Sequence, residues 1–172
     1  MDIWTLKETL IDKQYEKFNE IKKDDLVIDI GAAIGDFSIS ASKRASKVIA
    51  YECDAERVML MEKNIKLHQT KNIIVRNEKA LSLNQILEKI KKVDFLKVDC
   101  EGCEYQIFKN AQKSALDKIE YIAMETHLFD EKMQANFLKL IKSFEKNGFL
   151  ITVVDNQVHD YICYLFAKKN KN

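Results

Sequence analysis

Several features that would assign the chain to a specialised class are missing from its 172 residues. No apolar run reaches the roughly 18 residues that a membrane-spanning helix needs, and the N-terminus lacks the basic and then apolar pattern of a signal peptide. The 28 basic and 27 acidic residues nearly cancel, so no overall field attracts nucleic acid or an anionic membrane. We therefore expect a cytoplasmic protein without a membrane span.

Proline is absent, and glycine is scarce, with four residues. The lack of proline excludes the Asn/Asp-Pro-Pro-aromatic motif that enzymes acting on the amino groups of nucleic-acid bases commonly use. Internal repeats are missing too. A hydrophobic content of 47% with 32% charged residues is typical of a globular chain, and the length fits one domain. We expect a helical extension at 1–22, one domain at 23–168 and a disordered tail at 169–172.

Cysteine is also sparse, and the four residues are Cys53, Cys100, Cys103 and Cys163. Disulfides are not expected in a chain that we assign to the cytoplasm. Cys100 and Cys103 form a C-x-x-C pair, but a zinc or redox site would need a second ligand pair or a thioredoxin-like context, and neither is evident. We interpret both as small apolar residues that fill space inside an acidic motif.

The most informative stretch is an apolar segment at 27–30 that leads through a turn of small residues into a helix. Small residues let a ligand approach the backbone, and free N–H groups at a helix start favour an anionic group. A dinucleotide fingerprint would need a small residue where Asp36 stands. The acidic-x-Gly-x-Gly-x-Gly loop of class I S-adenosylmethionine methyltransferases resembles the turn more closely, through Asp29, Gly31, Ala33 and Gly35. An ordinary turn that binds no ligand is the alternative.

An acid further along the chain supports a nucleoside ligand. The segment 48–51 predicts a buried strand, and Glu52 stands at its end, about 20 residues after the turn, where an acid can accept hydrogen bonds from ribose hydroxyls. Dinucleotides and S-adenosylmethionine share this offset, so Glu52 indicates a nucleoside without choosing between them.

Three separated motifs together resemble one family. They are the glycine loop, the run 93–105 with its Asp99-Cys100-Glu101-Gly102-Cys103-Glu104 core, and Glu125-Thr126-His127. In this order they closely resemble the FkbM family of class I methyltransferases, whose mark is Asp-x-Glu-Gly-x-Glu after a Lys-bearing strand. The resemblance covers about Asp25 to Phe166. It implies a Rossmann-like α/β fold with seven strands, mostly parallel with an antiparallel last strand, and helices on both faces.

The resemblance implies S-adenosylmethionine as the cofactor. The loop from Gly31 to Gly35 would hold its methionine part, Glu52 the ribose, and Asp99 would lie near the methionine amino group. Many class I members place an acid for the adenine amino group where Lys79 stands here, so backbone and apolar contacts near Ala80 and Leu81 would hold adenine instead. The expected cofactor-binding residues are Asp29, Gly31, Ala33, Gly35, Asp36, Phe37, Glu52, Cys53, Ala80, Leu81 and Asp99.

The acceptor is defined less closely. FkbM-like enzymes are associated with O-methylation, so we expect a hydroxyl on a small molecule, sugar or lipid, and a homo-oligomer could supply a missing wall of the acceptor site.

A hydroxyl must lose its proton, and His127 is the first candidate for the base, with Glu101 or Asp99 next. An imidazole without a catalytic role is the alternative. A nucleic acid is not expected, although a base N-methyltransferase remains an alternative, as does a nucleoside-binding protein without activity. The acids Asp99, Glu101 and Glu104 could hold a divalent cation, but our prediction includes no metal.

Lys97 lies in the middle of a strand that should be buried on both faces. A buried ammonium needs an acidic partner, and Asp29 and Glu125 are the natural candidates.

The last two predicted strands are too close in sequence for a helical crossover, so they should pair antiparallel. Apolar patterns predict helices at 2–21, 36–44, 83–92 and 131–146, and further strands at 73–75, 93–98, 119–124, 150–154 and 161–167. The first helix either packs against the sheet edge or covers the acceptor site.

Overall fold

The computed structural model describes residues 14–170. Most of the helix expected at 2–21 falls on residues 1–13, and the end of the tail on 171–172, both outside the described residues. The described end of the first segment contains a 3-10 turn, η2 (Gln14–Glu16). Tyr15 and Ile21 are buried there in a cluster with side chains of the sheet. This part of the segment therefore packs against the sheet.

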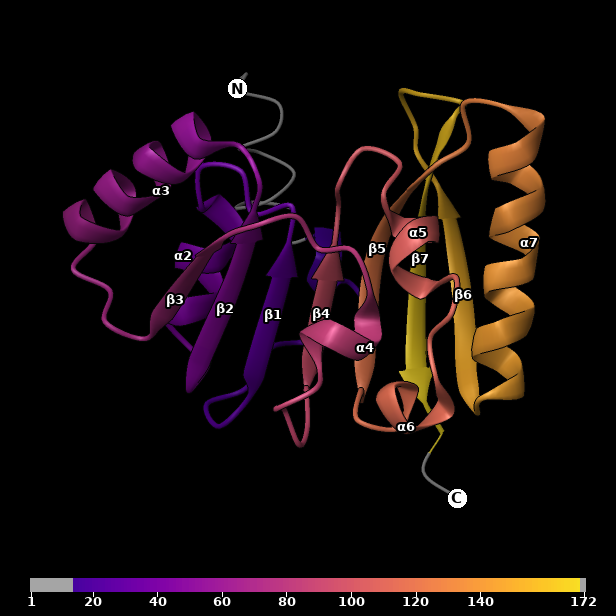
Figure 1. Cartoon of the computed structure of the whole chain (residues 1–172), viewed down its shortest axis with the longest axis horizontal. Coiled ribbons are helices and arrows are strands. Elements are labelled where there is room, and N and C mark those ends of the chain that lie inside the picture. The colour runs from indigo at the N-terminus through magenta and orange to yellow at the C-terminus, as the bar shows by residue number, and fades with distance from the viewer. Residues whose placement is uncertain (1–13, 171–172) are drawn as a thin grey trace.

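Seven strands form one sheet in the order β3-β2-β1-β4-β5-β7-β6 (Figure 1). The strands from β1 to β5 pair in parallel, and β7 is antiparallel to both β5 and β6. The predicted fold class is confirmed, including the antiparallel last strand. The strands are β1 (Leu26–Ile30), β2 (Lys47–Glu52), β3 (Ile73–Asn77), β4 (Phe95–Val98), β5 (Tyr121–His127), β6 (Phe149–Asp155) and β7 (Ile162–Lys169).

Helices cover both faces of the sheet, so the central strands are buried on both sides. One face packs against α4, α5, α6 and α7, and the other against α2, α3 and the segment around Tyr15. Four consecutive residues of β4 are buried, as expected for a parallel strand between two helical layers. The helices are α2 (Asp36–Ser42), α3 (Ala55–Leu67), α4 (Leu83–Ile86), α5 (Glu104–Phe108), α6 (Lys113–Leu116) and α7 (Glu131–Lys146).

Two elements differ from their predicted bounds in ways that matter for the site. The helix expected at 83–92 ends at Ile86, where Leu87 is fully buried and its carbonyl accepts a hydrogen bond from the Lys118 ammonium at 2.6 Å. Strand β5 continues to His127, because it pairs with β7 along its whole length. Glu125 and His127 therefore lie within a strand, which fixes their backbone more firmly than a loop would.

The expectation that the chain forms no disulfide is wrong, because Cys100 and Cys103 are bonded to each other with their Cα atoms 5.4 Å apart. Glu101 and Gly102, between them, both have left-handed backbone conformations, with φ of 55° and 97°. This tight turn brings the two sulfurs together, so the cysteines cross-link the acidic motif instead of only filling space. Cys53 and Cys163 are free thiols.

Reduction of this disulfide is expected to lower the free energy of unfolding by about 2 kcal/mol, the entropy that cross-linking so short a loop removes from the unfolded chain. Urea unfolding with and without a dithiol reductant measures the difference. The double variant Cys100→Ser/Cys103→Ser is the control, and its stability should not respond to the reductant. Equal stability of the oxidised and fully reduced wild-type chain would contradict the prediction.

Candidate active site

Four strands deliver side chains to one edge of the sheet, the edge where ligands bind in open α/β folds. Gly31 follows β1, Glu52 ends β2, Asp99 follows β4 and His127 ends β5. Because these strands are parallel neighbours, the four positions lie along the same edge (Figure 1). The structure therefore brings the three motifs of the sequence together.

The turn after β1 has the backbone of a glycine loop. Gly31, Ala33 and Gly35 all have positive φ, at 76°, 48° and 92°. A Cβ on Gly31 would lie 1.7 Å from the carbonyl oxygen of Asp99, so no side chain fits at that position. Ala33 adopts a conformation that costs alanine more than glycine, so the loop keeps the backbone of the glycine pattern although its middle glycine is replaced.

Glu52 is joined directly to this turn. Its side chain is buried, and one carboxylate oxygen accepts a hydrogen bond from the Ala33 N–H at 2.9 Å. The other oxygen accepts from the Asp54 N–H at the same distance. The acid at the end of β2 and the loop after β1 therefore form one rigid unit, although they are far apart in sequence.

The remaining residues expected at the cofactor site differ in accessibility. Cys53 and Leu81 are exposed, and Ala80, which precedes Leu81, is buried. Asp36 begins α2, and its pKa is raised by burial and by the charge of Asp29. Phe37, by contrast, is buried against the rings of Tyr15 and Phe95 and belongs to the core.

Lys97 is a buried residue of β4. In the sheet register it lies directly opposite Asp29 of β1. Its ammonium lies 3.1 Å from Asp29 Oδ1 and donates a hydrogen bond to the Gly31 carbonyl at 2.9 Å. Burial alone would lower the pKa of Lys97, but the charges of Asp29 and Asp99 more than offset it, and the pKa is raised. The predicted pairing with Asp29 is confirmed. The second ion pair is with Asp99, at 3.6 Å, and not with Glu125.

Asp29 itself has no exposed surface. Its Oδ2 accepts a hydrogen bond from the Ser38 hydroxyl at 2.6 Å, and its Oδ1 faces Lys97. This geometry supports the loop from below, through Lys97 and the Gly31 carbonyl. The sequence predicted that Asp29 contacts the cofactor directly. Its buried position below the loop does not favour such a contact.

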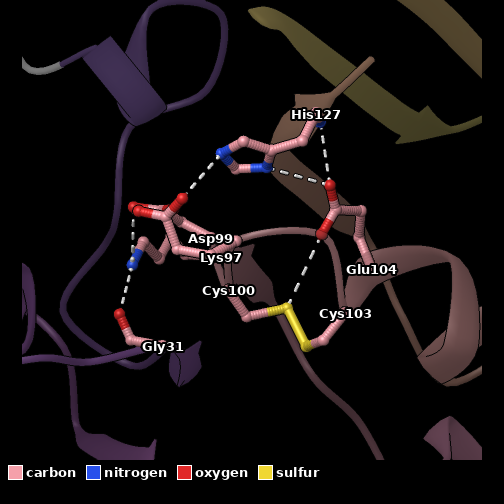
Figure 2. The surroundings of a disulfide bond; sticks show 8 residues. Gly31, Lys97, Asp99, Cys100, Cys103, Glu104 and His127 are labelled. Atoms are coloured by element: carbon pink, nitrogen blue, oxygen red, sulfur yellow. Dashed lines mark hydrogen bonds and ion pairs between the residues drawn. A yellow bond between two sulfur atoms is a disulfide. The ribbon is translucent and has the colours of Figure 1, made fainter. Parts of the chain in front are cut away.

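His127 is held by a glutamate whose role the sequence analysis missed. Glu104 Oε1 accepts the His127 backbone N–H at 2.8 Å and lies 3.0 Å from the ring Nδ1 (Figure 2). Both side chains are buried. Glu104 shares the inward face of α5 with Ile107 and Phe108 at positions i, i+3 and i+4. A charged residue at a core position of a helix needs a buried partner. The position of Glu104 on the apolar face of α5 was therefore the sequence feature that could have indicated its role.

The surroundings of His127 favour its charged form. Burial alone would lower the pKa of His127, but the hydrogen bond and charge of Glu104, with the charges of Glu125 and Glu101, raise the pKa overall. A protonated imidazole cannot accept another proton. The electrostatics therefore weigh against His127 as the base that the sequence suggested first.

Three further carboxylates surround the ring Nε2. Glu101 Oε2 lies 3.3 Å from it and Glu125 Oε1 3.6 Å. Asp99 is within the same cluster, and its Oδ2 accepts a hydrogen bond from the Tyr15 hydroxyl at 2.9 Å. Tyr15 lies 84 residues away in sequence, and no local pattern could have placed it here. The acceptor side of the edge is therefore strongly acidic.

Glu125 is expected to make the stability of the chain depend on pH. Its pKa is raised from 4.5 to about 7, first by burial and then by the charge of Asp99. Between these values the folded chain holds a proton that the unfolded chain has lost, so the free energy of unfolding falls as the pH rises through this window, by up to about 3 kcal/mol. Below and above the window this group adds no slope.

The variant Glu125→Gln should lose this part of the pH dependence and be the more stable protein above pH 7. Urea unfolding at several pH values from 4 to 8, in buffer with a chelator, measures it. Glu145→Gln, which removes an exposed acid on α7, is the control and should keep the wild-type slope. The same slope in Glu125→Gln as in wild type would contradict the assignment.

Two exposed aromatic rings continue the site outward from His127. The Phe129 ring lies 5.1 Å from the imidazole, and the Tyr161 ring lies 5.4 Å from Phe129. Phe129 is 53% exposed and Tyr161 44%. The Leu128 N–H donates a hydrogen bond to the Tyr161 carbonyl at 2.8 Å, which holds the two loops together. An apolar surface therefore borders the acidic cluster.

A sheet with an antiparallel β7, a glycine loop after β1 and acids at the ends of β2 and β4 define a class I methyltransferase domain. The model of the FkbM methyltransferase domain matches residues 60–151, more than half of the chain, and the chain belongs to this family. The model of the TRM5/TYW2 methyltransferase domain matches residues 8–95. No curated protein sequence matches the chain.

Solved structures share the fold at low sequence identity. An rRNA methylase from Streptococcus thermophilus is 11% identical with a TM-score of 0.68, covering 88% of this chain and 90% of that one. TrmK from M. capricolum, in complex with S-adenosylhomocysteine, is 18% identical with a TM-score of 0.67, covering 92% and 67%. The tRNA m1G37 methyltransferase of M. jannaschii is 25% identical with a TM-score of 0.61, covering 93% and 48%.

The match to methyltransferase family models identifies the chain as an S-adenosylmethionine-dependent methyltransferase. The edge of the sheet fits that cofactor, because the buried carboxylate of Glu52, joined to the glycine loop, offers oxygens that can accept hydrogen bonds from ribose hydroxyls. Within residues 14–170, no helix has the length and apolar character to cross a membrane.

Proposed function

We propose that the chain transfers the methyl group of S-adenosylmethionine to a hydroxyl oxygen of a small molecule, a sugar or a lipid. The observation that carries this proposal is the cluster of Asp99, Glu101 and Glu125 beside His127. Carboxylates accept hydrogen bonds from hydroxyls and repel a polyanion such as RNA. The exposed rings of Phe129 and Tyr161 offer the apolar contact that a small acceptor needs.

The cofactor residues follow the order of the strands. We propose that the turn from Gly31 to Gly35 holds the methionine part, that Glu52 accepts hydrogen bonds from the ribose, and that adenine lies near Ala80 and Leu81. S-adenosylmethionine supplies an electrophilic methyl group when bound. The protein then contributes mainly position, because holding the acceptor oxygen in line with that methyl group accounts for much of the rate.

Among the three candidates for the base, we propose Glu101. Its side chain is 78% exposed and lies against His127, so it can reach an acceptor hydroxyl at the edge. Asp99 is bound to Tyr15 and paired with Lys97. His127 has a raised pKa and positions its neighbours. The variant Glu101→Gln should therefore slow turnover while leaving cofactor affinity unchanged.

Glu52→Gln is expected to weaken binding of S-adenosylhomocysteine by about 10- to 100-fold, because a charged hydrogen-bond acceptor is worth about 1.5 to 3 kcal/mol. Isothermal titration calorimetry measures the affinity. Glu56→Gln is the matched control, since Glu56 is exposed in the first turn of α3 and only four residues away. Equal affinities of both variants and wild type would contradict the ribose assignment.

The acceptor is found by incubating the protein with S-adenosylmethionine labelled in its methyl group and a fractionated extract of the source cells. We expect label in the small-molecule or lipid fraction, absent when Glu52→Gln replaces the wild type. Label that appears only in macromolecules and is released by ribonuclease would contradict a small-molecule acceptor.

RNA is the second candidate acceptor. It is favoured by the match to the TRM5/TYW2 model and by the likeness to a tRNA methyltransferase. A groove of about 470 Å³ between α5 and α7 also begins at Gly102 and carries Lys109, Lys132 and Lys139 along its walls. Lysines placed in this way can contact phosphates. Binding of a labelled tRNA that weakens in the triple Lys→Ala variant would favour this candidate over the first.

A further inference from the structure

Asp99, Glu125 and His127 bring three metal-ligating atoms within 4.8 Å of one another. They come from the ends of two neighbouring strands, β4 and β5, which the sheet holds at a fixed separation. His127 Nε2 and Glu125 Oε1 are 3.6 Å apart, a separation that a cation bound to both would bridge. We propose that these three residues form a binding site for a divalent cation of the Mn²⁺ type.

Each of the three side chains is oriented by a second group. His127 Nδ1 lies 3.0 Å from the buried carboxylate of Glu104. The Tyr15 hydroxyl donates a hydrogen bond to Asp99 Oδ2, and Tyr164 is hydrogen-bonded to Glu125. Metal ligands in proteins are held by outer partners of this kind, which fix the ring orientation and leave the other ligand atom free.

The ring Nε2 points into the carboxylate cluster. His127 is 1% exposed, and its Nε2 lies 3.3 Å from Glu101 Oε2 and 3.6 Å from Glu125 Oε1. Figure 2 shows Nε2 directed away from Glu104, toward the side of Asp99. A nitrogen donor and carboxylate oxygens that converge on one point are a ligand set that a divalent cation can use.

The balance of charge points the same way. The carboxylates that surround this point outnumber the Lys97 ammonium and the His127 ring together, even where the ring is charged, and partly buried acids without compensation are costly. A dication bound by neutral His127 would offset two of the negative charges. The carboxylates counted here are Asp99, Glu101, Glu104 and Glu125.

The donor set selects the class of cation. Carboxylate oxygens suit Mn²⁺ and Mg²⁺, and an imidazole nitrogen shifts the preference toward a first-row transition metal. Three protein ligands leave further coordination positions for water and for an acceptor oxygen. If the proposed function is correct, the cation would bind the acceptor hydroxyl and lower its pKa, which eases loss of its proton to Glu101.

The test is a titration of the full chain with Mn²⁺, after treatment with a chelator and without cofactor, followed by the electron paramagnetic resonance of free Mn²⁺. We expect saturable binding of one ion per chain. Glu125→Gln and His127→Gln should each weaken it at least tenfold. The controls Glu145→Gln and His68→Gln remove exposed residues of the same types and should bind as wild type.

A spectroscopic measurement keeps the test independent of the folding of any variant. Pulsed electron paramagnetic resonance of the wild-type complex should show coupling of Mn²⁺ to one imidazole nitrogen. No saturable binding up to millimolar Mn²⁺, no nitrogen coupling, or equal affinity in folded Glu125→Gln and His127→Gln would overturn the proposal. Calorimetry with S-adenosylhomocysteine is run in parallel: loss of that binding alone counts against the proposed function, and loss of Mn²⁺ binding alone against the metal site.

Discussion

Replacing Gly31 by alanine is expected to destabilise the chain by about 3 to 5 kcal/mol and to abolish binding of S-adenosylhomocysteine. A left-handed conformation costs an alanine about 1 to 2 kcal/mol. The added Cβ would also lie 1.7 Å from the Asp99 carbonyl oxygen, an overlap with backbone that no rotamer change can relieve. The ends of β1 and β4 would have to separate, which displaces the glycine loop and Asp99 together.

The matched control is Gly148→Ala. Gly148 also has a positive φ, of 81°, but a Cβ there would meet no atom within 4 Å. It should cost only the conformational penalty of about 1 to 2 kcal/mol and leave cofactor affinity unchanged. Urea unfolding and calorimetry of both variants separate the two contributions. If Gly31→Ala and Gly148→Ala lost the same stability, the close approach of β1 and β4 would contribute nothing to the free energy of unfolding.

The fold class was predicted from the resemblance to the FkbM family, and the positions of its strands were predicted from local signals in the sequence. The apolar segments that became β1, β2 and β4 each end at a polar or small residue, so the edge that carries Gly31, Glu52 and Asp99 could be placed before the structure was known. The short connection between the last two strands required them to be antiparallel, and β6 and β7 are. Chain connectivity and side-chain alternation are sufficient for inferences of this kind.

The inner arrangement of the site could not be predicted, because it depends on contacts between distant segments. Glu104 begins α5, but its partner His127 is 23 residues away in sequence. Tyr15 reaches Asp99 from a segment that lies 84 residues away in sequence. The Cys100–Cys103 bond was missed because the chain was assigned to the cytoplasm, where disulfides are rare. The turn that closes it also places Glu101 in a left-handed conformation, which glutamate rarely adopts.

Asp29→Ala is expected to cost about 3 to 5 kcal/mol of stability, because it leaves the ammonium of Lys97 buried without its nearest counter-charge. Asp99, at 3.6 Å, is farther from Lys97 and is already bound to Tyr15, so it compensates only in part. Lys97→Met should cost a similar amount, since it leaves the Asp29 carboxyl group fully buried without its counter-charge. Unfolding by urea gives both values.

The double variant Asp29→Asn/Lys97→Met separates stability from binding. With both charges removed, the free energy of unfolding should return to within about 1 to 2 kcal/mol of wild type, because a buried ion pair adds little net stability over neutral side chains. Affinity for S-adenosylhomocysteine should not recover, because the Gly31 carbonyl has lost its hydrogen bond from Lys97 and the loop is no longer held from below. If affinity returned with stability, the pair would serve the fold alone, and the loop would need no support from Lys97 to bind the cofactor.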